Sequence, residues 1–238
     1  MFPRKPFLLF CLATLCAVTG RAQIGPEIAR QHAQRAGDRL AALQGLRAEG
    51  RILIGAETIS VVAIAQRPGR LRVETTTPLR HVIQVTDGVS PAWISHPDTN
   101  AGAPQDMPEV DARDFAVSAD FDGVLVDYAA KGYSVDYAGE EVLDGKRAAK
   151  LLVMGKRDEI FFLWVDAESH EIVKRLLYRT RSGRRIAVET LYKDFRPVGG
   201  VLQPYRIETL ADGQPVYVMI MDRMEANPII APGTFARP

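Results

Sequence analysis

The sequence has little cysteine, no excess of charge of either sign and a single long apolar run. Both of its cysteines, Cys11 and Cys16, precede residue 17 of 238, so the rest of the chain can form no disulfide and no thiolate metal site. Its 30 Lys and Arg balance 29 Asp and Glu, which removes the basic excess typical of nucleic-acid-binding proteins. With 47% apolar and 25% charged residues, the composition is that of a globular protein.

The apolar run lies at the N-terminus and has the features of a secretory signal. Phe7–Val18 follows the basic pair Arg4–Lys5 and precedes Gly20–Ala22, which places small residues at the −3 and −1 positions of a cleavage site. This pattern predicts a signal peptide over residues 1–22, and the run is too short for a permanent membrane helix. An uncleaved anchor is the alternative.

Cleavage would leave a single domain, residues 23–238, without cysteine. Neither cysteine of the signal follows the small residue that a lipid-attachment site requires, because Phe10 precedes Cys11 and Leu15 precedes Cys16. We therefore expect export to the periplasm with no lipid anchor. No second apolar stretch of about 18 residues follows in the sequence.

The pattern of apolar residues predicts one helix followed by many strands. Residues 26–43 carry apolar residues at helical spacings, and from Leu46 onward the period changes to two. Strands are predicted from Leu46 and at 58–66, 70–76, 81–86, 92–96, 133–142, 148–155, 159–166, 171–181, 184–195, 204–210, 216–225 and 234–237.

The connections between these strands are short, which favours an antiparallel meander. More than ten strands are too many for a flat open sheet. The predicted fold is mainly β: a single large antiparallel curled sheet, an unclosed or half β-barrel, with a helical lid on its concave side. The lid would consist of helix 26–43 and segment 108–131, in which Phe121, Leu125 and Tyr128 form a helical stripe.

Motifs for catalysis or for a cofactor are not found. The four histidines have no metal-ligand spacing. The stretch Asp120–Gly123 resembles a calcium loop, but its glycine stands at position 4, and Lys131 replaces the bidentate glutamate. No nucleophile elbow or phosphate-binding glycine loop occurs. We predict no metal, no cofactor and no enzymatic activity, with a site assembled from distant residues as the alternative.

Three predicted strands are apolar on both faces: 59–65, 160–165 and 216–221. A half-solvated sheet alternates apolar and polar residues, so these strands predict an interior larger than two short helices can fill. Methionines suit irregular apolar ligands, and Met219 and Met221 lie in the last of the three. Ordinary core packing is the alternative for any one of these residues.

Two predicted hairpin tips are basic: residues 179–185 and the pair Lys156–Arg157. They are either solvated turns or local docking sites for anionic headgroups or an acidic partner.

Several short motifs, in order, resemble those of LolA/LolB-like outer membrane lipoprotein-sorting proteins. The resemblance extends across the whole of residues 23–238. Its motifs are Arg67–Val73, Asp87-Gly88 with Trp93, Tyr137–Lys146, Phe162–Asp166, Tyr192–Phe195, Gly199–Val201 with Pro204, Asn227 and Phe235.

The resemblance implies an unclosed barrel with a helical lid and a hydrophobic cavity that shelters acyl chains in the periplasm. It also implies that Arg67, which precedes a proline as in the carriers, forms hydrogen bonds to the lid and holds it closed. Guanidinium offers five fixed donors for such a role.

The favoured hypothesis is a monomeric periplasmic carrier that binds acyl chains of lipoproteins or lipids, with membrane-anchored donor and acceptor proteins as possible partners and no nucleic acid. Lid residues would be Phe121, Leu125 and Tyr128. Wall candidates are Trp93, Phe161, Leu163, Met219 and Met221. The alternative is an envelope sensor or scaffold that uses the same barrel to bind a lipid or a protein.

Overall fold

The computed structural model describes residues 16–99, 102–155, 159–181 and 183–238. Within these residues the chain forms three helices and thirteen strands. The helices are α1 (Cys16–Gln34), α2 (Asp38–Ala42) and α3 (Glu109–Ser118). In this part of the chain no helix is both long and apolar enough to cross a membrane. The first 15 residues, which hold most of the predicted signal peptide, lie outside the described residues.

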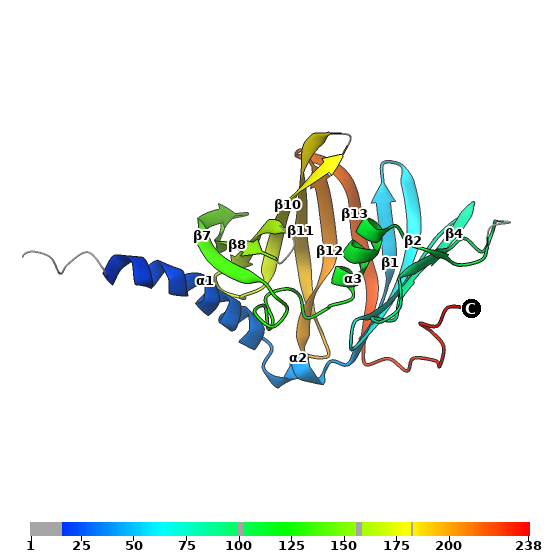
Figure 1. Ribbon diagram of the computed structural model, residues 1–238, viewed down its shortest axis with the longest axis horizontal. Coiled ribbons are helices and arrows are strands. Elements are labelled where there is room, and N and C mark those ends of the chain that lie inside the picture. The colour runs from blue at the N-terminus through cyan, green and yellow to red at the C-terminus, as the bar shows by residue number, and fades with distance from the viewer. Residues whose placement is uncertain (1–15, 100–101, 156–158, 182) are drawn as a thin grey trace, which may run out of the picture.

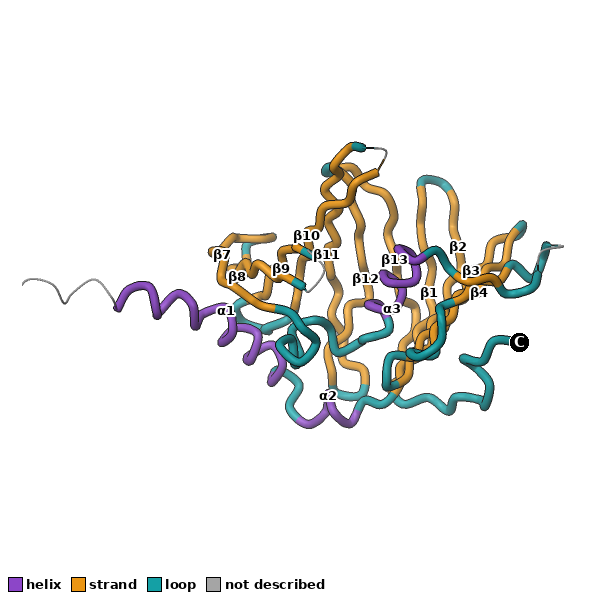
Figure 2. The backbone as a smooth tube through the Cα atoms, in the orientation of Figure 1, coloured by secondary structure: helices purple, strands orange, loops and turns teal. Residues whose placement is uncertain are grey.

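All of these strands belong to one antiparallel sheet (Figures 1 and 2). They are β1 (Gly45–Ile54), β2 (Glu57–Gln66), β3 (Arg70–Thr77), β4 (Arg80–Thr86), β5 (Trp93–Ser95), β6 (Gln105–Asp106), β7 (Ser134–Leu143), β8 (Lys146–Met154), β9 (Ile160–Asp166), β10 (Ile172–Arg181), β11 (Arg184–Val198), β12 (Val201–Ala211) and β13 (Gln214–Ala226). The order is β6-β5-β4-β3-β2-β1-β13-β12-β11-β10-β9-β8-β7. The predicted fold class, mainly β with one unclosed antiparallel sheet, is confirmed.

Short turns join most neighbouring strands, as the sequence predicts. The turns Asp144-Gly145 and Asp212-Gly213 have both residues at positive φ, between 48° and 81°. This is the conformation of type I′ hairpin turns, which Asp-Gly favours because glycine adopts positive φ without strain.

The pairing of β1 with β13 joins the two halves of the sheet. Its register shifts between Glu49 and Gly50. A side chain at Gly50 would collide with the main-chain oxygen of Ile220. The bulge therefore requires glycine, because the two backbones approach too closely there for a Cβ.

The helices and the segment between β6 and β7 cover one face of the sheet, which we call the concave face. α1 packs against β7, where a Cβ on Gly25 would lie 2.9 Å from main-chain atoms of residues 135–137. Farther along α1, Ala29 joins a buried cluster with side chains of β7, β8 and β9. At the other end α3 lies in front of the sheet (Figure 1), and its Phe115 packs against Ala65 and Leu71.

The predicted helix over residues 26–43 is confirmed in part. The chain is helical on both sides, but α1 ends at Gln34 and α2 begins at Asp38. Between them Gly37 adopts a φ of 54°, which a continuous right-handed helix does not allow.

The prediction of a helix through Phe121, Leu125 and Tyr128 is wrong. This segment is a series of turns, with positive φ at Gly123 (78°) and Asp127 (51°). Those two residues break the helix even though the apolar spacing fits one. The helix of this region is α3, which ends before the stripe begins.

The C-terminal segment covers part of the opposite, convex face. Val85 and Trp93 pair across β4 and β5, and they form a buried cluster with Phe235, beside Ile230. The prediction of a strand over 234–237 is wrong, because these residues form a turn and its continuation. They cover the sheet instead of extending it.

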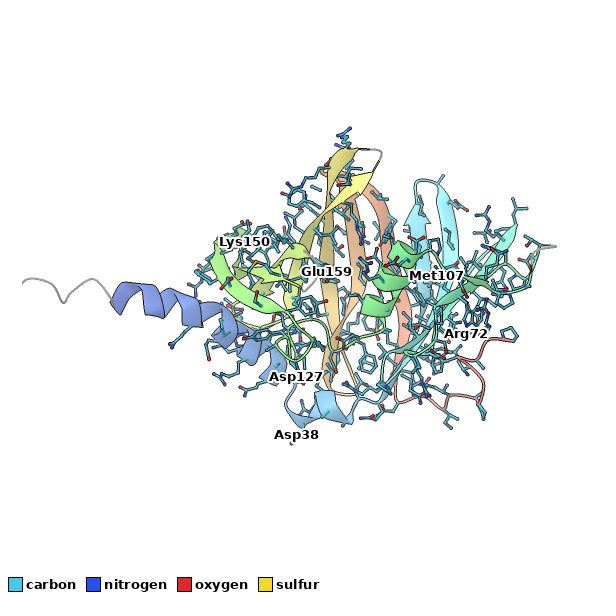
Figure 3. All side chains as sticks on the ribbon, viewed as in Figure 1. Asp38, Arg72, Met107, Asp127, Lys150 and Glu159 are labelled. Atoms are coloured by element: carbon cyan, nitrogen blue, oxygen red, sulfur yellow. The ribbon has the colours of Figure 1, made fainter. Side chains whose placement is uncertain are left out.

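Strand β9 is apolar on both faces, and lysines cover its outer one. Trp164 is only 1% exposed. The Nζ atoms of Lys150 (labelled in Figure 3) and Lys174 each lie 4.8 Å from the centre of its ring. Lys150 Nζ also lies 5.1 Å from the centre of the Phe162 ring. Lysine stems cover apolar surface while their charged ends reach water, so this strand needs no second layer of structure.

Candidate functional site

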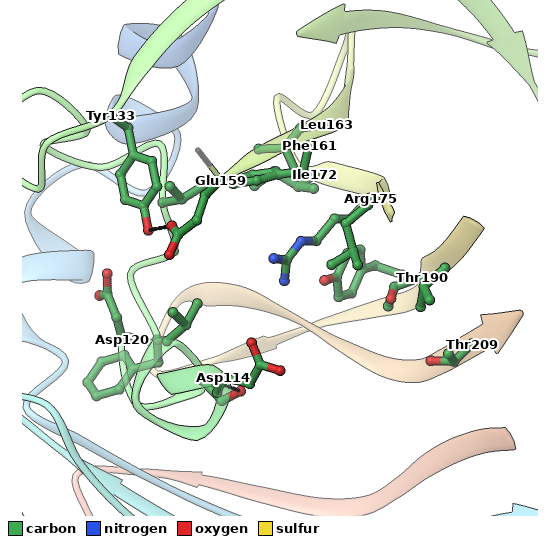
Figure 4. A pocket seen from close by; sticks show the side chains of 18 of the residues that line it. Asp114, Asp120, Tyr133, Glu159, Phe161, Leu163, Ile172, Arg175, Thr190 and Thr209 are labelled. Atoms are coloured by element: carbon green, nitrogen blue, oxygen red, sulfur yellow. Dashed lines mark hydrogen bonds between the residues drawn. The ribbon is translucent and has the colours of Figure 1, made fainter. Parts of the chain in front are cut away.

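A cavity of about 1180 Å³ lies between the concave face and α3 (Figure 4). Strands β9 to β13 contribute its sheet side, and α3 with residues 120–124 contributes the other. Its volume exceeds the roughly 300–1,000 Å³ of ordinary small-molecule sites. The cavity therefore has room for an extended ligand.

One part of the sheet side is a continuous apolar surface. Phe161 of β9 pairs with Leu177 of β10, which pairs with Val188 of β11. Leu163 lies two residues along β9 from Phe161, and all four side chains line the cavity. Residues paired directly across strands point to the same face, so these side chains form one surface. We call it the apolar wall.

A row of polar side chains crosses the same face beside the apolar wall. Arg175 pairs with Thr190, Thr190 with Thr209, and Thr209 with Tyr217. All four line the cavity, and we call them the polar row. Arg175 also pairs with Leu163 on its other side, so the row begins where the apolar wall ends.

Three buried side-chain atoms of the described residues have no hydrogen-bond partner, and all three belong to residues that line this cavity. They are Nε of Arg175, Oγ1 of Thr209 and Nε2 of His32. Buried polar atoms are nearly always hydrogen-bonded in folded proteins. Their concentration around one cavity makes it the candidate functional site.

Most other charged groups around the cavity are paired, and Arg175 is not. The pairs are Arg35–Glu171 (2.7 Å), Lys131–Asp120 (2.5 Å) and Arg179–Asp114 (2.6 Å). Among the described residues no carboxylate lies within 4.0 Å of Arg175, whose guanidinium carbon lies 4.8 Å from the Phe161 ring centre. The described residues also hold no cluster of three or more potential metal ligands.

A buried ion pair and a buried histidine lie where α1 meets the cavity. Arg35 Nε donates to Glu171, and its Nη1 donates to the His32 carbonyl oxygen at 2.7 Å. His32 Nδ1 donates to the His170 carbonyl oxygen at 2.7 Å. Burial raises the pKa of Glu171 although Arg35 acts against the rise. Burial, and next the Arg35 charge, lowers the pKa of His32 from 6.5 to about 4, so His32 is neutral at neutral pH.

We expect His32 to make the fold less stable in mild acid. The unfolded chain takes up a proton on this histidine below about pH 6.5, whereas the folded chain resists until about pH 4. Its contribution is fully present above the unfolded pKa and falls by about 3 kcal/mol between pH 7 and pH 4. His32→Asn keeps the bond to His170 and does not titrate. Urea unfolding of both proteins across this range should show a flatter pH dependence for the variant; parallel curves would exclude His32 as the responsible group.

Arg67 fastens part of the cavity lining to the end of α2. Its guanidinium forms a two-point ion pair with Asp122. Its Nε donates to the Leu43 carbonyl at 2.8 Å, and Nη2 donates to the Leu40 carbonyl at 3.0 Å. The guanidinium carbon also lies 4.8 Å from the Phe121 ring centre. Asp122 and Phe121 line the cavity, so Arg67 holds this lining in place from behind.

The structure separates the three predicted lid residues. Phe121 lines the cavity. Leu125 is 1% exposed and packs in the buried cluster that includes Phe161 and Leu163, and Tyr128 packs against the same cluster. Two of the five predicted wall residues, Phe161 and Leu163, line the cavity.

Met219 and Met221 lie on the concave face but outside the cavity lining. Tyr217, Met219 and Met221 are every second residue of β13, so their side chains point to the same face of the sheet. The two methionines pack farther along the strand with Ala48 and Tyr205. They are core residues in this structure and do not line the cavity.

Trp93 lies on the convex face, opposite the cavity, so its prediction as a wall residue needs correction. Leu71 faces α3, where it packs near Phe115. Its neighbour Arg72 points the other way and pairs with Val85, which pairs with Trp93. The register of three strands thus sets the direction of this side chain.

The basic tip of β10 and β11 makes contacts within the molecule. Arg184 pairs with Asp212 at 2.9 Å, and Arg185 lies 4.0 Å from the Tyr178 ring centre. The other predicted basic tip, Lys156–Arg157, lies outside the described residues.

Comparison with solved structures shows which proteins share this fold. A domain described as an outer membrane lipoprotein-sorting protein from Vibrio parahaemolyticus matches with a TM-score of 0.64 at 11% identity, over 90% of this chain and 97% of that one. A LolA superfamily protein from Nitrosomonas europaea matches with a TM-score of 0.53 at 15% identity, over 85% and 94%. The chain therefore has a LolA-like fold, as the sequence resemblance implies.

A DUF1329 family protein from Desulfovibrio piger also matches, with a TM-score of 0.65 at 11% identity over 90% of this chain and 97% of that one. No protein-family model matches the sequence, and no curated protein matches it. At these identities the likeness is one of fold.

Proposed function

We propose that this protein is a periplasmic carrier that binds acyl chains of lipoproteins or lipids non-covalently in the cavity. The observation that carries the proposal is the apolar wall, which lies inside a cavity of about 1180 Å³. Each methylene transferred from water to such a surface contributes about 0.8 kcal/mol, so a long acyl chain binds without chemistry on the cargo.

The sequence and the fold support this proposal independently. The pattern of residues 1–22 is that of a cleavable export signal, and the fold is shared with a lipoprotein-sorting domain. The predicted cleavage before Gln23 falls within α1. The exported form would keep the part of the helix from Gln23 to Gln34, which includes Gly25 and Ala29 against the sheet.

The covering of the cavity is suited to opening. α3 has no buried residue, and Val110 and Val117 on it are exposed. Two ion pairs tie this covering to the sheet: Asp114 with Arg179 of β10, and Asp122 with Arg67. Besides these pairs, the covering packs on the sheet through Phe115 and Phe121. A short segment held by so few contacts opens at low cost.

Filling the cavity should abolish acyl binding. Val188 is the β11 member of the apolar wall and lines the cavity, so Val188→Trp would occupy the space of the acyl chain. We expect its affinity for a single-chain amphiphile such as tetradecanol to fall at least tenfold, which corresponds to about 1.4 kcal/mol. Displacement of a neutral fluorescent acyl probe measures the change.

Val142→Trp is the matched control, because Val142 is exposed on edge strand β7 and is not part of the apolar wall; its affinity should not change. Native mass spectrometry of the wild-type protein from the periplasm should show co-purified acyl lipid and a polypeptide that begins at Gln23. A wild-type protein that takes up no amphiphile would contradict the proposal, and a stable lipid-free complex with another protein would favour the sensor alternative.

A further inference from the structure

Arg175 is a cation without a counter-ion beside an apolar wall. Its Nε is buried and has no partner, and among the described residues no carboxylate lies within salt-bridge distance. Its guanidinium packs over the ring of Phe161. Holding an unpaired charge in such surroundings is unfavourable. Asp114, Asp120 and Glu171 already pair with other cations, and Glu159 accepts from Tyr133 and lies beyond 4.0 Å from Arg175. The position is explained if a ligand supplies the missing negative charge.

The neighbours of Arg175 in the polar row are hydroxyl donors. Directly paired residues have Cβ atoms about 4.5–5.5 Å apart, so Thr190 lies directly beside Arg175 and Thr209 follows one strand farther along. Oγ1 of Thr209 is buried and unpartnered. Figure 4 shows the guanidinium pointing into the cavity, with Thr190 and Thr209 following it along the sheet. Guanidinium and hydroxyl groups together are donors suited to an oxyanion.

One tyrosine hydroxyl adds to this set. Tyr192 lies two residues from Thr190 on β11 and also lines the cavity. Burial raises the pKa of Tyr192 and of Tyr133, and in both cases the Arg175 charge acts in the opposite direction. Both hydroxyls therefore lie close enough to Arg175 to interact with its positive charge. Tyr133 donates to Glu159 at 3.5 Å, which leaves Tyr192 as the additional donor.

We infer that the polar row, led by Arg175, binds the oxyanion headgroup of an amphiphile whose acyl chain lies on the apolar wall. The inference rests on the proposed function and adds a headgroup class to it. The ligand is a carboxylate or a phosphate with an acyl chain, because both groups accept two parallel hydrogen bonds from guanidinium. Arg175 pairs with Leu163 on one side and Thr190 on the other, so head and chain would meet at this residue.

Three amphiphiles with the same chain test the inference: tetradecanoate, tetradecyl phosphate and tetradecanol. Wild-type protein should bind at least one anion about tenfold or more tighter than the alcohol, as expected for charge-assisted hydrogen bonds. Arg175→Met should remove that preference and leave the affinity for tetradecanol within about twofold. A preference for tetradecanoate would indicate a fatty acid as the source, and one for tetradecyl phosphate a phospholipid; either supports the inference.

Arg196→Met is the matched control. Arg196 also lies over an aromatic ring, 4.5 Å from the centre of Tyr205, but it is exposed and pairs with Asp194 at 2.7 Å. This variant should keep the anion preference. Thr209→Val, nearly isosteric, should lose part of it, and Arg175→Lys should retain part of it. These two variants keep the test decisive if Arg175→Met does not fold.

Thermal unfolding without ligand separates binding from a structural role. Arg175→Met removes an unpaired charge, so its melting temperature should equal or exceed that of the wild type. Equal affinity of the wild type for all three probes would overturn the headgroup inference and leave the carrier proposal intact. Binding of none of them would instead overturn the carrier proposal. An equal loss for all three probes in Arg175→Met would show that Arg175 only shapes the cavity.

Discussion

Replacing Arg67 by leucine is expected to lower the free energy of unfolding by about 3 kcal/mol and to speed the release of bound amphiphile. The change leaves Asp122 without its cation and the Leu43 carbonyl without its donor. The Leu40 carbonyl keeps only the Leu43 N–H, at 3.2 Å. Each 1.4 kcal/mol lost from the closed arrangement increases the open population about tenfold. Chemical denaturation measures the first effect, and stopped-flow displacement of a bound fluorescent acyl probe measures the second.

Arg72→Leu provides the comparison for Arg67→Leu. Arg72 is also partly buried, and it donates to Glu74 at 2.6 Å and to the Thr234 carbonyl at 3.2 Å, on the convex face. The Arg72→Leu variant should be less stable than the wild type but release the bound probe at the wild-type rate. Adding Asp122→Asn to Arg67→Leu removes the unpaired charge, so the double variant should regain stability but still release quickly. If Arg67→Leu releases the probe at the wild-type rate, Arg67 has no role in closing the cavity.

Replacing Arg35 by methionine is expected to cost about 3–5 kcal/mol of stability at pH 7. Arg35 and Glu171 are both buried, with side chains 9% and 6% exposed, so the variant leaves a carboxylate in a dry site. Arg179→Met breaks a pair whose side chains are 42% and 46% exposed, and it should cost less than about 1 kcal/mol. Urea unfolding of the three proteins in parallel gives both values.

The loss in Arg35→Met should shrink in acid. Burial already raises the pKa of Glu171 against the Arg35 charge, so removing that charge raises it further. When the pKa of a carboxyl group is higher in the folded chain than in the unfolded chain, the fold becomes more stable as the pH falls toward the pKa of the unfolded chain. The variant should therefore lose less at pH 5 than at pH 7, and Glu171→Gln in the same chain should restore part of the loss at pH 7. A pH-independent loss would show that the buried carboxylate is not its cause.

The strands could be predicted because their signal is local. Alternation of apolar and polar residues and Asp-Gly turns both depend on neighbours in the sequence. The helix over residues 109–118 also has local signals, since Pro108 precedes it and Glu109 and Asp111 lie in its first turn, where acidic groups are favourable. The stripe from Phe121 to Tyr128 was the more conspicuous pattern, but its side chains pack in different clusters.

The cavity lining could be predicted only in part, because it depends on register. Phe161 and Leu163 are two residues apart on one strand, and the structure places both on the cavity side. Trp93 and the polar row could not be found in this way. A shift of one residue turns a side chain to the other face, and no single strand shows that Arg175, Thr190 and Thr209 are aligned.

The pairing of β1 with β13 has a consequence for how the chain folds. Every other pairing in the described sheet joins strands that follow each other along the chain, so each half can grow hairpin by hairpin. The β1–β13 ladder, by contrast, joins Leu46 to Ala226 and must close a loop of nearly the whole chain, which is entropically costly and slow. Two separately formed half-sheets would therefore dock late. The polar row ends at Tyr217 on β13, so it lies entirely within the half made of β7 to β13. Its alignment would therefore be completed before the half made of β1 to β6 docks.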